Sequence, residues 1–111
     1  MNEIEEIGAL NLDEDQIIKI SKAAESAARK IIFKKIPKRA ILDLNIIIEV
    51  IKENYLTFNI DINLTLSPFY KINLDEVIRE AVDEAFKTIR RKIKELVGDA
   101  DANGRKIKGF H

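Results

Sequence analysis

The residues that most often carry out chemistry in proteins are scarce in this chain. Its single histidine is His111, the last residue, and histidine is the side chain that general acid–base catalysis uses most often. Ser21, Ser26 and Ser67 therefore lack a histidine base within the predicted folded part, so a nucleophilic triad is unsupported. The absence of cysteine excludes a thiolate nucleophile, a disulfide and a cysteine-based zinc site.

Carboxylates are the next candidates for chemistry. Glu80 and Glu84 are one helical turn apart, on what the sequence predicts to be a solvent-facing stripe. Asp43 and Asp61 are both expected on the polar face of a predicted hairpin, where an acid pair could meet across the strands. Nothing in the surrounding sequence marks either pair as catalytic, so we interpret them as solvated surface groups.

One segment partly matches a calcium-binding loop. Residues 99–104, Asp-Ala-Asp-Ala-Asn-Gly, reproduce the first half of an EF-hand loop, but its twelfth position is Phe110 where the motif needs a bidentate glutamate. The glycines are isolated, so no glycine-rich phosphate loop is present; they are Gly8, Gly98, Gly104 and Gly109. We therefore expect no catalytic residue, no metal site, no cofactor and no small-molecule substrate, and hence no enzyme.

Length and composition describe one domain. A chain of 111 residues fits a single domain of ordinary size, and 46% hydrophobic residues are enough for a core. The N-terminus has neither the basic start nor the apolar run of a secretory signal. No apolar run approaches the roughly 20 residues that a membrane-spanning helix needs. We expect a soluble cytoplasmic protein that does not contact a membrane.

A first helix is predicted over residues 14–35. Asp13 and Gln16 form a capping-box pattern, in which each side chain can bond to the other's backbone N–H. Pro37 ends the helix, because proline removes a donor and clashes with the preceding turn. Small residues occupy the middle of its apolar stripe and predict close approach to a neighbour; they are Ser21, Ala24, Ala27 and Ala28.

A second helix is predicted over residues 74–97. Asn73 and Glu76 give another capping signature at its start, and Gly98 suits the left-handed position after its end. Its apolar stripe is wide, which indicates contact with both a sheet and the other helix.

The segment between the helices predicts an antiparallel hairpin. Apolar and polar residues alternate over residues 42–51 and 55–66, joined by the short polar link 52–54. The fold class is therefore α+β, a two-layer helix-strand-strand-helix domain with both helices on one face of the hairpin. We expect a flexible arm over residues 1–12, the domain over 13–98 and a flexible tail over 99–111.

A two-stranded sheet leaves both edges unpaired, which favours completion by a second copy of the chain. The candidate interface residues are apolar or aromatic and lie off the main core stripes: Phe33, Ile47, Ile51 and Tyr55. The alternative is that they pack locally at the ends of the elements. Our leading interpretation is a non-enzymatic protein–protein interaction module that forms a homodimer.

The charges fall in blocks although the net charge is zero, with 19 basic and 19 acidic residues. Residues 29–39 and 87–94 are basic, which indicates phosphate contacts and an RNA- or ribosome-associated protein as the alternative function. The candidate contacts are Lys34, Lys35, Lys38 and Arg39. The opposing interpretation is internal balance, because antiparallel helices place the basic end of each beside the acidic start of the other.

Several short segments resemble an uncharacterised archaeal protein family, a domain of unknown function often encoded beside the prefoldin beta subunit. The resemblance rests on Lys35-Ile36-Pro37-Lys38, Leu42-Asp43-Leu44, Leu64-Thr65-Leu66-Ser67-Pro68 and the helix from Asp75 to Val97. It covers roughly residues 13–97. These motifs are structural, so the resemblance implies an archaeal cytoplasmic protein and transfers no catalytic residue.

Overall fold

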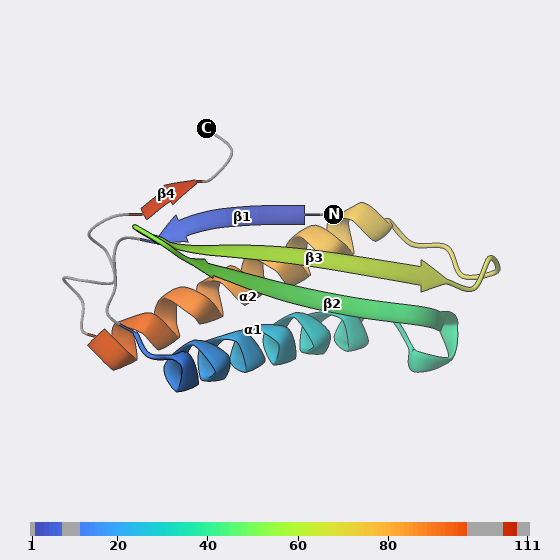
Figure 1. Cartoon of the computed structure of the whole chain (residues 1–111). Coiled ribbons are helices and arrows are strands. Elements are labelled where there is room, and N and C mark those ends of the chain that lie inside the picture. Colours follow the sequence, from blue (N-terminus) through green and yellow to red (C-terminus); the bar gives the residue numbers. More distant parts are fainter. Residues whose placement is uncertain (1, 8–11, 98–105, 109–111) are drawn as a thin grey trace.

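Both predicted helices and the predicted hairpin are present in the structure (Figure 1). The computed structural model describes residues 2–7, 12–97 and 106–108. In chain order the elements are β1 (Asn2–Ile7), α1 (Glu14–Lys35), a 3₁₀ turn (Lys38–Ala40), β2 (Ile41–Lys52), β3 (Leu56–Leu66), α2 (Leu74–Val97) and β4 (Lys106–Lys108).

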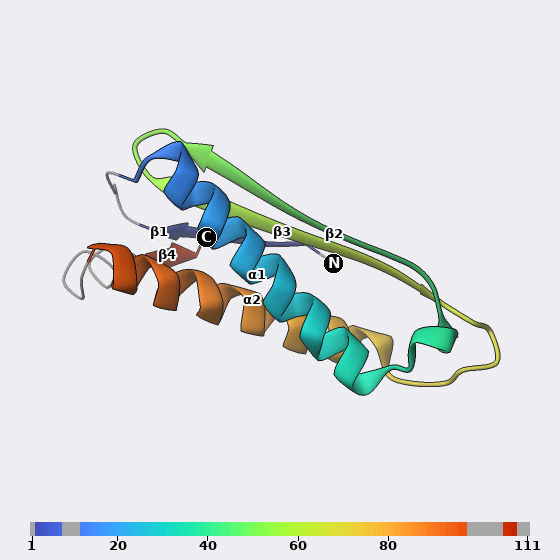
Figure 2. The ribbon, with the colours of Figure 1, turned by 90° about the horizontal axis from the view of Figure 1, so that it is seen from below.

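The sheet has the strand order β2-β3-β1-β4, and all neighbouring strands are antiparallel. Both helices lie against one face of this sheet, as Figures 1 and 2 show from two directions. The α+β class and the two-layer arrangement with both helices on one face are therefore confirmed. The other face of the sheet carries no helix among the described elements.

The structure differs from the prediction at both ends of the chain. Residues 1–12 were expected to form a flexible arm, yet Asn2–Ile7 forms β1 and pairs along the edge of β3. Residues 99–111 were expected to form a flexible tail, yet Lys106–Lys108 forms β4 beside β1. The unpaired backbone groups of β3 provide the physical reason, because a strand from the same chain satisfies them. The remaining terminal residues lie outside the described parts.

The core lies between the sheet and the helices. The inward side chains of β3, including Phe58 and Ile60, are fully buried, and each such side chain contributes about 1.5–3 kcal/mol through burial. Ala24 and Ala28 of α1 are also fully buried, and their small side chains let α1 pack closely against its neighbours. The wide stripe of α2 is buried as well; its buried residues are Val77, Ile78, Ala81, Val82, Ala85, Phe86, Thr88, Ile89 and Ile93.

The alternation of apolar and polar residues expected in β2 is interrupted near the start of the strand. Leu42 was expected on the apolar face with Leu44, but the register between β2 and β3 shifts between Ile41 and Asp43. The extra residue of this bulge turns Leu42 outward, where it is 63% exposed, and Ile41 packs against the core instead.

The capping box at the start of α1 is confirmed. The backbone N–H of Gln16 donates to a side-chain oxygen of Asp13 at 2.8 Å, and the N–H of Asp13 donates to the side chain of Gln16 at 3.0 Å. At the start of α2, the N–H of Glu76 donates to the side-chain oxygen of Asn73 at 3.2 Å. These bonds satisfy backbone donors that have no partner inside the helix.

Candidate functional sites: an open strand edge and a basic groove

The polar groups considered for catalysis do not come together. Asp43 lies opposite Thr65 and Asp61 lies opposite Ile47, so the two aspartates do not face each other across the strands. Among the described residues, no group of three acidic, histidine or cysteine side chains could hold a metal ion. His111 and the partial calcium loop at residues 99–104 lie outside the described parts. Neither α1 nor α2 contains an apolar stretch long enough to cross a lipid bilayer.

The first candidate site is the outer edge of β2. One edge of β2 pairs with β3, and the strand lies at the end of the sheet, so within the described part of the chain no strand pairs with its other edge. Eight of its twelve residues are apolar. Ile47 and Ile51 are 45% and 46% exposed on the face away from the helices. On the helix side, Ile48 and Val50 are only partly buried, so the strand presents apolar groups on both faces.

The four predicted interface residues do not form one patch. Ile47 and Ile51 are four residues apart on the same face of β2. Tyr55 is half-buried in the link before β3. Phe33 lies near the end of α1, where the ammonium group of Lys38 is 5.4 Å from the centre of its ring, a cation–π contact that accounts for Phe33 locally.

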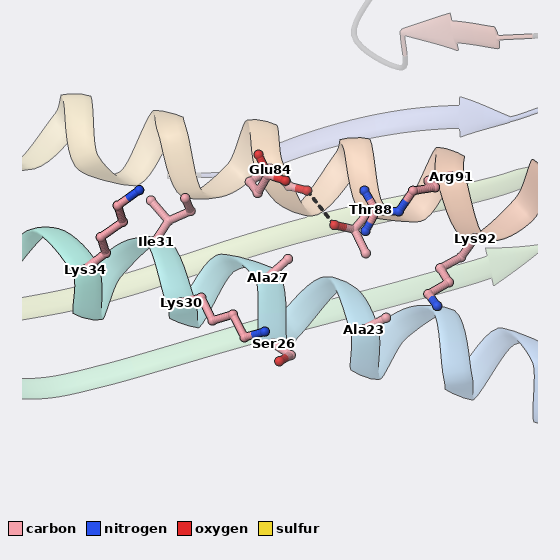
Figure 3. Close-up of a pocket in the computed structure, with 10 residues that line it drawn as sticks. All are labelled: Ala23, Ser26, Ala27, Lys30, Ile31, Lys34, Glu84, Thr88, Arg91 and Lys92. Carbon is pink, nitrogen blue, oxygen red and sulfur yellow. Dashed lines mark hydrogen bonds between the residues drawn. The ribbon is translucent and has the colours of Figure 1, made fainter.

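The second candidate site is a groove between α1 and α2, with a volume of about 480 Å³ (Figure 3). Small residues form its α1 wall, and the buried Thr88 on α2 donates its hydroxyl hydrogen to the backbone oxygen of Glu84 at 2.9 Å. Four cations and one acid contribute to the lining. The lining residues are Ala23, Ser26, Ala27, Lys30, Ile31, Lys34, Glu84, Thr88, Arg91 and Lys92.

The groove draws on both basic blocks but divides the predicted contact residues. Of the four, Lys34 lines the groove, whereas Lys35 forms an ion pair with Glu80 of α2 at 3.0 Å. Lys38, in the 3₁₀ turn, lies over the ring of Phe33 in α1, and Arg39 of the same turn is exposed. Lys35 therefore shows the expected ion pairing between the end of α1 and the start of α2. The other three predicted contact residues do not gather in one site, because Lys34 lines the groove whereas Lys38 and Arg39 belong to the 3₁₀ turn.

The second basic block has a partner that the sequence did not indicate. We expected the basic end of α2 to lie near the acidic start of α1. The two helices do run antiparallel with these ends together (Figures 1 and 2), and Arg90 in addition donates through Nη1 to both carboxylate oxygens of Glu5 in β1, each at 2.8 Å. Glu5 is only 8% exposed, so this ion pair joins β1 to α2 in the space between the sheet and the helices.

This arrangement defines a class of two-layer α+β domain that solved structures share. A crystal structure from Thermococcus onnurineus superposes with a TM-score of 0.74 at 26% identity, covering 86% of this chain and 93% of that one. The solution structure of a hypothetical protein from Methanothermobacter thermautotrophicus has a TM-score of 0.69 at 21% identity, covering 81% and 97%.

Residues 10–92 match the model of the DUF3194 family, described as a protein of unknown function, and the chain belongs to that family. An uncharacterised protein of Thermococcus kodakarensis is 24% identical over 84% of this chain and 86% of its own length. An uncharacterised protein of Pyrococcus horikoshii is 22% identical over 95% of this chain and 90% of its own. The resemblance to an uncharacterised archaeal family is therefore confirmed.

Proposed function

We propose that this protein is a non-enzymatic, cytoplasmic interaction module that forms a homodimer by pairing β2 with β2 of a second copy. The observation that carries the proposal is the outer edge of β2, which is long, pairs with no strand in the described part of the chain, and carries exposed Ile47 and Ile51 among polar residues on its outer face. Such an edge presents a row of backbone N–H and C=O groups that a strand of a second copy can satisfy.

The sequence of β2 lacks most features that protect an exposed edge. Natural edge strands are short, or carry lysine, proline or a bulge along their length. The bulge of β2 is at Leu42, near its start, and its lysine is Lys52, the last residue. Between them, Asp43 and Glu49 are the only charged residues, so most of this stretch remains suitable for pairing with another strand.

A two-fold axis at Ile47 gives a favourable register for this pairing. An antiparallel pair about such an axis keeps each side chain on its own face of the sheet, so Ile47 meets its own copy. Glu49 then lies opposite Asn45, and Ile51 lies opposite Asp43. Because no two like charges face each other, the edge is complementary to itself.

Light scattering at micromolar concentration tests this proposal, with an expected mass of twice that of the chain. Ile47→Lys should yield a monomer, because it places two ammonium groups against each other at the axis. The matched control is Phe69→Lys, which changes a 93% exposed apolar residue outside the strands and should leave the dimer intact. A monomeric unmodified protein, or equal dissociation by both variants, would contradict the proposal.

A further inference from the structure

We propose that the groove between α1 and α2 binds the phosphodiester backbone of a single-stranded nucleic acid. The groove lies on the helices with the strands behind it in Figure 3, so it is separate from the edge of β2 and does not depend on dimer formation. The charge of the groove, its shape and the residue types that line it favour this ligand.

The charge of the groove is locally positive although the chain as a whole is neutral. Its four cations, Lys30, Lys34, Arg91 and Lys92, outnumber its single acid, Glu84. Lys92 pairs with Glu95 of its own helix at 3.5 Å. Within the described residues, none of the other three cations forms an ion pair, so their charge is available to an anion.

The shape suits a chain of phosphates better than one small anion. The α1 wall extends from Ala23 to Lys34, which is about 16 Å of helix. Lys34 lies toward one end of the groove, whereas Arg91 and Lys92 lie toward the other (Figure 3). A single phosphate would need donors that converge on one point, but these cations are distributed along the groove.

The lining also argues against other ligands. No aromatic residue lines the groove, so bases have no surface on which to stack, and binding should depend on the backbone. The α1 wall consists largely of small or charged residues, and Ile31 is the one large apolar side chain in the lining, which offers little to the apolar anchor residues of a helical peptide. We therefore expect binding that depends steeply on salt and little on base sequence.

The test measures the affinity of the full chain for an oligouridylate of about 12 nucleotides by fluorescence anisotropy as salt rises from about 50 to about 200 mM. Three phosphate contacts, one for each cation without an ion pair, predict a logarithmic salt slope of about −2.1, which is a loss of affinity of about 18-fold. K30Q/K34Q should bind more weakly, and its affinity should fall only about 2.6-fold over the same range, because one contact remains.

The control variant K38Q/R39Q removes the same charge from the 3₁₀ turn, outside the groove, and should retain the slope of the unmodified chain. An oligothymidylate of the same length distinguishes RNA from DNA as the source of the backbone, and binding of either supports the proposal. No binding to either strand, equal losses in both variants, or tighter binding of a polyglutamate peptide than of the oligonucleotides would overturn it. Thermal melting of each variant checks that the fold is intact.

Discussion

Arg90 of α2 and Glu5 of β1 form a two-point ion pair in which one guanidinium nitrogen lies 2.8 Å from each carboxylate oxygen. Their side chains retain 31% and 11% of their exposure, so the carboxylate is largely removed from water and the guanidinium only partly. The pair links a strand that begins the chain to a helix that nearly ends it. Its position explains why a glutamate is tolerated between sheet and helix.

Removal of either partner should be costly. Glu5→Leu leaves the guanidinium of Arg90 without its partner, and we expect a loss of about 1–3 kcal/mol in the free energy of unfolding. The double variant Glu5→Leu/Arg90→Leu should recover much of that loss, because neither charge then remains inside the layer. Urea unfolding of the two single variants and the double variant gives the coupling energy. Glu3→Leu, on the same strand but exposed, is the control; simple additivity of the two single effects would contradict the prediction.

A covalent test of the dimer register follows from the absence of cysteine in the chain. With Ile47 on the two-fold axis, Ile47→Cys should form a disulfide-linked dimer under mild oxidation, since directly opposed Cβ atoms in a sheet are about 4.5–5.5 Å apart. Non-reducing electrophoresis reports the product. Phe69→Cys is more exposed and should crosslink more slowly; faster crosslinking there would argue against the proposed register.

The close packing of α1 predicts sensitivity to added volume. Ala28 is fully buried, so Ala28→Leu should lower the free energy of unfolding by about 1–3 kcal/mol through overpacking. Lys22→Leu adds a leucine at an exposed position of the same helix and should change stability by no more than about 0.5 kcal/mol. Chemical denaturation compares them, and equal effects would show that the interface of α1 accepts larger residues.

The capping box at the start of α1 predicts a smaller effect. Asp13→Ala removes the acceptor of the Gln16 N–H, and we expect a loss of about 1 kcal/mol. Asp13→Ser keeps an oxygen at that position and should retain most of the stability. Thermal unfolding distinguishes the two, and identical melting temperatures would mean that the cap contributes nothing measurable.

The ion pair between Lys35 and Glu80 should contribute much less than the pair at Glu5. Its side chains are 40% and 46% exposed, so water and salt screen the attraction, and a double-mutant cycle with alanine should give about 0.2–1 kcal/mol. Raising the salt concentration should reduce that coupling further. A coupling as large as that of Glu5 and Arg90 would contradict this ranking.

The helices and the hairpin could be predicted because local patterns determine them. The Asp13 cap, Pro37 and the alternation along β3 each act within a few residues, and the structure retains all three. The bulge at Leu42 could not be anticipated from alternation, because it depends on the register with β3 rather than on the composition of β2.

Strand β1 could not be predicted because its pattern is inverted. Glu5 lies opposite Phe58, on the helix side of the sheet, whereas Ile4 lies opposite Asn59 and is 37% exposed. An interior glutamate becomes acceptable through Arg90, which is distant in sequence, so no local rule would identify it. The groove escaped prediction for a related reason, because it combines parts of two basic blocks whose side chains diverge around their helices.

The position of β1 in the sheet has a consequence for biosynthesis. The ribosome releases β1 first, but its partner strand β3 and the neutralising Arg90 are made only later. Because contacts between neighbouring segments form before those that close long loops, the β2–β3 hairpin and its helices should assemble before β1 docks. Pulse-labelling hydrogen exchange during refolding would then show the amides of β1 protected after those of β3, and β1 would stay accessible to chaperones until β3 and Arg90 have been synthesised.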